Sequence, residues 1–306
     1  MMLDIIGKRF WFFLISGVLI LIAIISLATL GLKPGIEFSS GSMLTLRFET
    51  PPEYTQFQQA IVKLGYTDSI IQRTGQGEFL IRTQELSGEE KAQLEAALTA
   101  QFGNLSESQF FSVSPLVATE TARNAAIAVI VAMVGILLYV TWAFRHMPSP
   151  FRYGTCAIIA LFHDALVTMG LFSLFGGILG WEINLMFITG ILTIIGYSIN
   201  NTIVVFDRIR ENVTRGISAD FEVIVNSSVV ETMSRSLNTS ITTVITVLAL
   251  LLFVGSTIQN FAVVLLIGII AGTYDSVFVA PGLLVVWNKG EWGRFISRPK
   301  PSEAKA

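Results

Sequence analysis

The sequence predicts a polytopic α-helical membrane protein with six transmembrane helices and one extracytoplasmic α+β domain between the first and second helices. Of the 306 residues, 52% are hydrophobic and 14% are charged, and the mean hydropathy is +0.66. This balance is far from that of a soluble globular domain. Several apolar segments reach the roughly 20 residues that a helix needs to cross a bilayer. One long connection, after the first of them, is polar enough to fold in water.

The net charge argues against a nucleic-acid partner, and the cysteine content excludes an intramolecular disulfide. A formal net charge of -2 provides no basic field, so we expect no nucleic-acid partner. Cys156 is the single cysteine and lies within an apolar segment, which excludes an intramolecular disulfide.

The first apolar segment follows Lys8 and Arg9 and runs from Phe10 to Leu30. It is longer than a signal-peptide core and has no small-residue cleavage site, so we interpret it as a retained helix. The five further apolar segments are about Ala122 to Ala143, Tyr153 to Phe175, Ile183 to Phe206, Leu237 to Val254 and Asn260 to Trp287.

Basic residues predict the orientation of these spans. The short loops Gly176 to Trp181 and Gly255 to Gln259 contain no Lys or Arg. The basic residues at the other ends are Lys8, Arg9, Arg145, Arg152, Arg208, Arg210, Arg215, Lys289, Arg294, Arg298 and Lys300. The positive-inside rule therefore predicts that both termini are cytoplasmic and that the connection from Gly31 to Thr121 is outside.

The long outer connection reads as alternating strands and helices. We expect strands at Met43 to Phe48, Ser69 to Arg73, Glu78 to Thr83 and Phe110 to Val117, with a Gly75, Gln76, Gly77 turn between the second and third. Helices are expected at Glu53 to Leu64 and, after a Ser87 and Glu90 capping box, up to about Phe102. The β-α-β-β-α-β order is that of a ferredoxin-like domain, a fold with many unrelated functions. The expected division is 1–31 for the N-terminus and first helix, 32–120 for this domain, 121–288 for helices two to six, and 289–306 for a cytoplasmic tail.

Ionisable residues within the spans are the first candidates for function, because a charge in the bilayer needs a partner, water or a role. His163 and Asp164 lie about eleven residues beyond Arg152, which places them roughly 17 Å deep. Asp275 lies at a similar depth in the sixth span. A buried structural histidine is an equally good interpretation of His163 alone.

Polar residues also form stripes on the fourth and fifth spans. Ser198, Asn201 and Arg208 share one helical face. Arg235 is followed on its own helix by Thr239, Thr242 and Thr246. Such a stripe either packs against another helix or lines a hydrated path. Gly268 and Gly272 form a G-x-x-x-G pattern that permits close helix packing, and Asp207, Arg208 and Arg210 are typical of the cytoplasmic end of a helix.

No enzyme site, cofactor motif or metal site is predicted. His163 and Asp164 are adjacent, so they leave a helix about 100° apart and are not expected to face each other. We see no clustered metal ligands and no Walker A sequence.

Five motifs resemble those of the SecF family of bacterial protein export. Gly35, Glu37 and Phe38, with Gly41 nearby, resemble the G-I-D-F-x-G-G signature after the first helix. The other four motifs are Leu161 to Asp164, Gly196 to Arg210 (GYSINNTIVVFDRIR), Ser234 to Thr243 (SRSLNTSITT) and Gly272 to Tyr274. Together they extend over most of the chain.

The resemblance implies both an architecture and a function. SecF belongs to the resistance-nodulation-division (RND) superfamily, so this chain would be a six-helix half that needs SecD to complete twelve helices. It would use the proton-motive force with SecD to promote late-stage preprotein translocation through SecYEG, with YajC as a further partner. Its place would be the bacterial inner membrane, in contact with lipid.

Two residues depart from the family pattern. Asn201 occupies a position where the family's motif usually has Asp, while the partner arginine is present as Arg235. Asp275 stands where the motif is expected to have serine. We hypothesise that Asp275 or Asp164 takes over part of the ion path with a carboxylate from SecD. Coupling mainly through SecD, and coupling to sodium rather than protons, are the rival hypotheses.

Two other functions remain open from the sequence. One is an RND-type half that moves lipids or small hydrophobic solutes, although such relatives usually carry larger outer domains. The other is an assembly factor that stabilises the translocon without transducing energy, which Asn201 favours.

Overall fold

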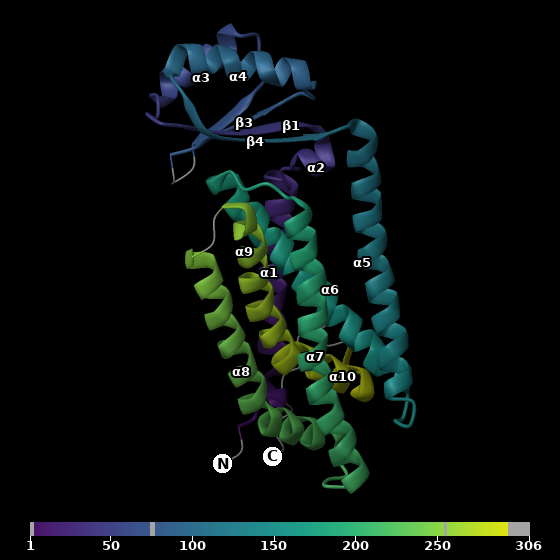
Figure 1. Cartoon of the computed structure of the whole chain (residues 1–306). Coiled ribbons are helices and arrows are strands. Elements are labelled where there is room, and N and C mark those ends of the chain that lie inside the picture. Colours follow the sequence, from purple (N-terminus) through teal and green to yellow (C-terminus); the bar gives the residue numbers. More distant parts are fainter. Residues whose placement is uncertain (1–2, 74–76, 254–255, 293–306) are drawn as a thin grey trace. The chain divides into compact units, whose positions relative to one another are not determined.

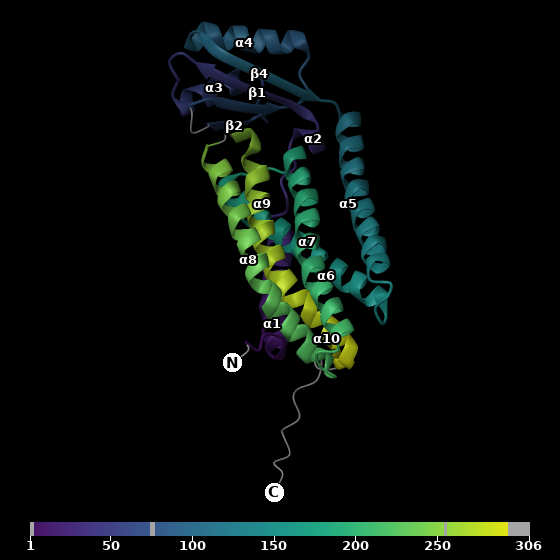
Figure 2. The same ribbon diagram turned by 60° about the horizontal axis from the view of Figure 1, so that its bottom comes forward.

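The computed structural model describes residues 3–73, 77–253 and 256–292 (Figures 1 and 2). The chain divides into two compact units. One contains residues 33–128 together with the short segment 182–185, and it includes the β-sheet. The other contains the rest of the chain, and its described residues are almost entirely helical.

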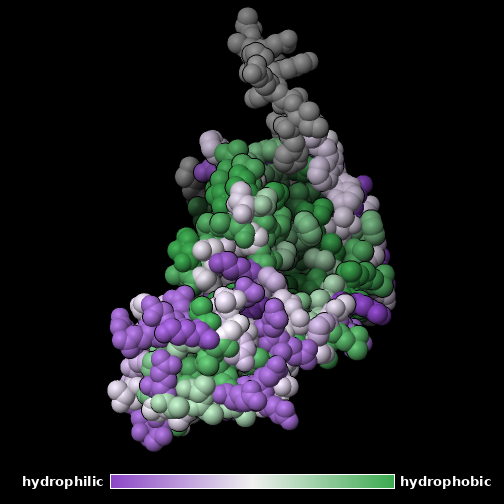
Figure 3. Space-filling view, turned by 90° about the horizontal axis from the view of Figure 1, so that it is seen from above, coloured by the Kyte–Doolittle hydropathy of each residue, from purple (hydrophilic) through white to green (hydrophobic). Residues whose placement is uncertain are grey.

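Among the described residues, six helices are long and apolar enough to cross a membrane, which confirms the predicted fold class. In chain order they are α1 (Arg9–Thr29, preceded by the 3-10 turn η1, Ile6–Lys8), α5 (Pro115–Ala143), α6 (Pro150–Leu179), α7 (Leu185–Arg215), α8 (Phe221–Phe253) and a sixth span from Ile258 to Lys289. Figure 3 shows the difference in surface chemistry: hydrophobic residues gather over the helices, and hydrophilic residues over the sheet-containing unit.

Several helices extend beyond the predicted apolar spans. Helix α5 begins at Pro115 rather than near Ala122, and α8 begins at Phe221 rather than at Leu237. The sequence from Phe221 to Ser236 contains four Ser, two Glu and one each of Asn, Thr and Arg, so hydropathy alone does not reveal it as helix. The predicted residues Val254, Gly255, Arg294, Arg298 and Lys300 lie outside the described residues.

Small residues bring the helices together. A Cβ at Gly170 of α6 would collide with Ala23 of α1, and one at Gly268 would collide with Ile194 of α7. Side chains at these glycines would therefore push the helices apart, as expected for membrane helices that associate through close backbone packing.

The sixth span is not a continuous α-helix. It consists of α9 (Ser256–Tyr274), the π-helical turn η2 (Asp275–Val279) and α10 (Ala280–Lys289). The backbone N–H of Ala280 bonds to the carbonyl of Asp275, one residue further back than in an α-helix. Such single π turns are rare and are frequent at functional sites.

The sheet-containing unit has the predicted β-α-β-β-α-β order. Its elements are β1 (Gly41–Phe48), α3 (Tyr54–Lys63), β2 (Ile70–Arg73), β3 (Phe79–Thr83), α4 (Gly88–Phe102) and β4 (Leu105–Val113). All strand pairs are antiparallel and the sheet order is β2-β3-β1-β4. This is the arrangement of a ferredoxin-like domain.

The core of this domain lies between the sheet and its two helices. Alternate residues of β1, namely Leu44, Leu46 and Phe48, are buried, as the period of a half-covered strand requires. The rings of Phe57 and Phe79 lie 4.2 Å apart between centroids at the centre of this core. The predicted capping box opens α4, with Ser87 and Glu90 bonded to each other's backbone amides.

The prediction for the last strand was wrong in its bounds. Strand β4 begins at Leu105 and ends at Val113, and it pairs with β1 from Gly41 to Phe48. The first half of β4 is polar and lacks the alternation of apolar residues that predicts a strand. Such a sequence is tolerated because β4 is an edge strand, which can expose both faces. The predicted end at Val117 is excluded by Pro115, which begins α5 and is well suited to the first turn of a helix.

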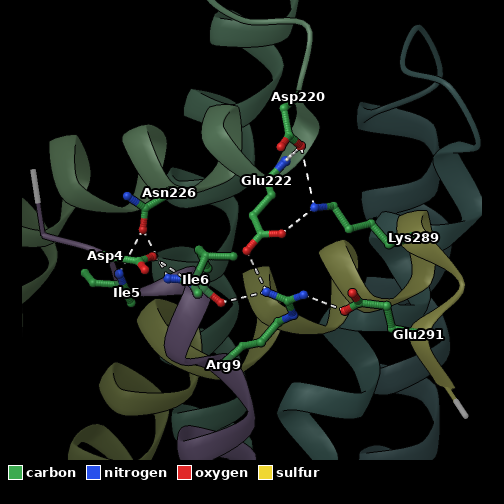
Figure 4. A network of polar contacts seen from close by, with 10 residues as sticks. Asp4, Ile5, Ile6, Arg9, Asp220, Glu222, Asn226, Lys289 and Glu291 are labelled. Carbon is green, nitrogen blue, oxygen red and sulfur yellow. Dashed lines mark hydrogen bonds and ion pairs between the residues drawn. The ribbon is translucent and has the colours of Figure 1, made fainter. Parts of the chain in front are cut away.

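Arg9 ties three parts of the helical unit together. Its guanidinium, which is 4% exposed, pairs with Glu222 of α8 at 2.7 Å and with Glu291 at 2.5 Å (Figure 4). Lys289 pairs with Glu222 from the other side. The Asn226 side chain accepts hydrogen bonds from the backbone N–H groups of Ile5 and Ile6. These contacts anchor the start of α1 and the end of α10 to the start of α8.

Candidate functional site

Three ionisable side chains converge within the helical unit. His163 and Asp164 come from α6, and Asp275 is the first residue of η2. The His163 Nδ1 atom lies 3.4 Å from Oδ1 of Asp164 and 3.8 Å from Oδ1 of Asp275. The three side chains are 4%, 2% and 0% exposed, respectively. Asp164 and Asp275, for which the sequence predicts a similar depth in two spans, thus lie in one buried cluster.

The polar atoms of this cluster are incompletely satisfied. Both carboxylate oxygens of Asp275 and Nε2 of His163 are buried without a hydrogen-bond partner among the described residues. Buried polar groups are nearly always hydrogen-bonded, because an unsatisfied group loses its hydration without compensation. These three atoms are therefore the ones in the cluster that a ligand from outside the chain could satisfy.

Asp164 is held in place by the fourth span. Ser198 of α7 donates a hydrogen bond from Oγ to Asp164 Oδ2 over 2.5 Å. Gly272 of α9 makes room for this pair: a Cβ at that position would lie 2.8 Å from Oγ of Ser198 and 3.2 Å from Oδ2 of Asp164. The second glycine of the predicted G-x-x-x-G pattern thus has a specific role, since it lets α9 pack against the carboxylate of α6.

Asn201 lies in a separate, neutral cluster. It is 3% exposed, and its Nδ2 donates to Ser240 Oγ of α8 at 3.4 Å. The Ser240 hydroxyl is also 2.6 Å from Thr273 Oγ1 and 3.2 Å from the Tyr197 hydroxyl. An amide among three hydroxyls needs no charge to be satisfied, so this position can be buried without a counter-ion.

Arg235 is not brought to either cluster. Its side chain is exposed on α8 and makes no hydrogen bond or ion pair to any side chain in the described part of the chain. Thr239, Thr242 and Thr246 are exposed on the same helix, where their hydroxyls donate to carbonyls of α8 itself. The predicted stripe therefore exists as a surface of α8, and no helix in the described part of this chain buries it.

Asp207 and Arg208 form surface ion pairs near the end of α7. Asp207 pairs with Arg210 at 2.5 Å, and Arg208 pairs with Glu211 and Glu231, each at 2.5 Å. This matches the interpretation of these residues as charges at the end of a helix.

The motif after the first helix lies in the sheet-containing unit. Gly35 precedes the short helix α2 (Ile36–Ser39), which carries Glu37 and Phe38 and was not predicted. The Gly35 N–H donates to the carbonyl of Ile183 at 2.7 Å, and a Cβ at Gly35 would lie 2.8 Å from that oxygen. Only glycine allows this approach without a shift of the chain.

Arg82 fixes the same region and was missed by the sequence analysis. Its guanidinium pairs with Glu182 at 2.6 Å and donates to the carbonyl of Pro34 at 2.7 Å and to Ser39 Oγ at 2.6 Å. In the sequence, Arg82 looks like an ordinary strand residue. Its partners are far away in the sequence, so only the structure shows that it holds the segments around Pro34 and Glu182 together.

Two expectations about His163 were wrong. Adjacent residues do leave a helix about 100° apart, yet Nδ1 of His163 lies 3.4 Å from Oδ1 of Asp164, so the two side chains turn toward each other. The expected absence of clustered metal ligands fails as well, because one ligand atom each from His163, Asp164 and Asp275 lies within 4.8 Å of the others. Asp275 comes from a span that is distant in the sequence from His163 and Asp164, so no local sequence motif predicts the cluster.

The chain matches known proteins over nearly its whole length. Residues 93–290 match the family described as protein export membrane protein SecD/SecF, C-terminal, and residues 25–52 match the SecD/SecF GG motif. It is 42% identical to the protein translocase subunit SecF of Thermobaculum terrenum, over 99% of each chain. The corresponding subunit of Anaerolinea thermophila is 40% identical, over 99% of this chain and 100% of that one.

This chain belongs to the SecF family. It is therefore a multi-pass membrane protein of the Sec protein-export machinery, and membership implies association with SecD and the Sec translocon. The resemblance predicted from five sequence motifs is confirmed.

Solved structures agree with this assignment. The chain aligns with SecDF of Thermus thermophilus, described as a translocon-associated membrane protein, with a TM-score of 0.81 and 34% identity. A structure of SecDF in its super-membrane-facing form gives a TM-score of 0.67 and 31% identity. This SecF-family chain covers 94% and 96% of its own length in these alignments but only 39% and 40% of the SecDF chains.

Proposed function

We propose that this SecF-family chain is one half of an ion-driven export motor, which uses the proton-motive force together with SecD to move preproteins outward. The observation that carries the proposal is the buried cluster of His163, Asp164 and Asp275 on two spans. Two carboxylates buried together are costly unless a cation is nearby. A coupling ion that enters the cluster would supply that positive charge. Its arrival and departure would change the electrostatic interaction between α6 and η2.

The charge of the ion path is relocated in this chain relative to the family pattern. Asn201 is satisfied by Ser240 in a neutral cluster, so that position cannot carry an ion charge. Asp275, which is not expected from the family motif, supplies a carboxylate at η2 instead. A further carboxylate would come from SecD, facing the exposed Arg235.

SecD is the partner that best fits the uncovered faces of α8 and α9. An apolar groove of about 390 Å³ lies between α8 and the sixth span, and it is lined by Leu237 and Ile241 of α8, Ile270 of α9 and Val277 of η2. Arg235 and the threonine stripe are exposed on a different face of α8. The groove suits an apolar partner helix, the stripe suits a partner helix that carries an acid, and lipid would cover the remaining apolar surface.

The proposal also includes a location in the membrane, an orientation and further partners. The chain would lie in the bacterial inner membrane with both termini cytoplasmic, because Lys and Arg are concentrated at the ends that this orientation places inside. SecYEG, YajC and the preprotein itself would be further partners. The chain would carry out no covalent chemistry of its own, so we do not expect it to be an enzyme.

A comparison of export with and without a proton gradient tests this function. Preprotein export is measured in inner-membrane vesicles that contain SecD with this chain, and in vesicles that lack the chain. The proposal predicts that the chain accelerates export only while the gradient is intact. A stimulation that survives collapse of the gradient would identify a translocon assembly factor instead.

The same vesicles address the transporter alternative. If the chain moved lipids or small hydrophobic solutes, gradient-dependent transport of such a compound would require the chain while preprotein export would not. We predict the reverse result.

A further inference from the structure

We propose that His163, Asp164 and Asp275 form a binding site for one divalent transition-metal ion of the Zn²⁺ class. The proposal concerns the chain itself and does not depend on its function as a motor. It would give the intramembrane cluster a ligand other than the coupling ion.

The spacing of the three side chains fits a single metal ion. Nδ1 of His163 is 3.4 Å from Oδ1 of Asp164 and 3.8 Å from Oδ1 of Asp275, and one ligand atom of each residue lies within 4.8 Å of the others. Ligands bound to one Zn²⁺ at about 2.0–2.2 Å are separated by about 3.0–3.5 Å. Small side-chain rotations would therefore bring all three into the coordination sphere.

The buried carboxylate oxygens of Asp275 favour a positively charged ligand. Asp275 is fully buried, and neither of its oxygens has a hydrogen-bond partner among the described residues. In the described part of the chain, His163 is the only basic side chain within 4.0 Å of either carboxylate. One divalent ion would balance both carboxylates and satisfy the orphaned oxygens at once.

The donor set selects the class of metal. An imidazole nitrogen with two carboxylates suits Zn²⁺ and its first-row neighbours, whereas Mg²⁺ and Ca²⁺ prefer ligands that are all oxygen. Ser198 already donates to the second oxygen of Asp164, which leaves Oδ1 to face the cluster. Such an outer hydrogen bond orients a metal-binding carboxylate. Three protein ligands would leave a fourth position for water.

A bound metal would have a mechanical consequence. It would join α6 to η2 at the one place where the sixth span departs from α-helical geometry. If the proposed ion path runs through the same carboxylates, Zn²⁺ would also compete with the coupling ion and slow gradient-dependent export. That consequence rests on the proposed function, whereas the binding itself does not.

Metal binding to the purified chain tests the site directly. The full chain is stripped of metal in detergent and dialysed against Zn²⁺, and the bound metal is counted by mass spectrometry. Co²⁺ is used in parallel because its absorption spectrum reports the ligand geometry. We expect one ion per chain in the wild type, and at least a tenfold weaker affinity in Asp275→Asn and in His163→Gln.

The matched control is Asp207→Asn, which removes an exposed carboxylate and should bind like the wild type. The thermal transition of each variant verifies that it is folded, and Asp164→Asn replaces any variant that is not. Absence of Zn²⁺ binding in the wild type, or equal binding in the wild type and the cluster variants, would overturn the proposal. Because export is not measured, failure here leaves the proposed function untouched.

Discussion

The Nδ1 atom of His163 lies 3.8 Å from Oδ1 of Asp275, which links the third span to the π-helical turn of the sixth. Neither residue has a Lys or Arg within ion-pairing distance among the described residues. The contact is therefore a pairing of a histidine with an uncompensated carboxylate in the membrane part of the chain.

Gly272→Ala should destabilise the helical unit by about 1–3 kcal/mol, the usual cost of an extra methyl group in a packed interior. The new Cβ would lie 2.8 Å from Ser198 Oγ and would disturb its hydrogen bond to Asp164. The measurement is the free energy of unfolding in detergent. Gly196→Ala is the control, because a Cβ at Gly196 meets nothing within 4 Å; equal losses in both variants would contradict the account.

Arg9→Gln should destabilise the chain by about 1–3 kcal/mol. Removal of one partner from a fully buried ion pair costs about 3–5 kcal/mol, and Glu222 and Glu291 are partly exposed, which lowers the value. Thermal unfolding of the purified chain measures it. Arg215→Gln removes an arginine whose ion pair is mostly exposed and should change stability by less than about 1 kcal/mol. A larger effect from Arg215→Gln than from Arg9→Gln would refute the importance of the Arg9 network.

The start of α4 should become less stable as the pH falls. Hydrogen bonds from the backbone N–H and the side chain of Ser87 lower the pKa of Glu90. A depressed pKa in the folded state adds stability that is fully present above the unfolded pKa, near 4.3 for Glu, and that is lost as the pH falls from there through the lower folded pKa. Hydrogen–deuterium exchange of the first turn of α4, corrected for intrinsic rates, should rise at acid pH. Ser87→Ala should already exchange faster at neutral pH and show a weaker pH dependence; an unchanged dependence would exclude the capping box as the cause.

Arg235→Gln should leave the isolated chain as stable as the wild type, because the side chain is exposed and forms no hydrogen bond or ion pair with another described side chain. If a carboxylate of SecD faces it, the variant should co-purify less SecD. Arg215→Gln changes the same charge near the end of α7 and should retain SecD. Loss of stability in Arg235→Gln alone would show that the arginine acts within this subunit.

Much of the fold is accessible from the sequence because each unit has a strong local signal. Long apolar runs identify the six spans, and alternation in β1 with the Ser87 capping box identifies the domain. The missed elements lack such signals. The first half of strand β4 is mostly polar, and the start of α8 mixes polar with apolar residues.

The candidate site could be predicted only in part. His163, Asp164 and Asp275 stand out because ionisable residues are rare in spans. Their mutual contact depends on helix packing and on the π turn at Asp275, and neither has a sequence signature. Likewise, the functions of Gly272 as a spacer and of Ser240 as the partner of Asn201 follow from pairing between helices that sequence periodicity cannot specify.

The central claim is that the buried cluster couples ion movement to export, and Asp275→Asn tests it most directly. Gradient-dependent export is compared in vesicles that carry SecD with the wild-type chain or with the variant, at equal levels of assembled complex. Asn keeps the shape of the side chain and removes its charge. We predict that the gradient-dependent part of export falls at least fivefold while the gradient-independent part is unchanged. Full gradient stimulation in the variant would contradict the account.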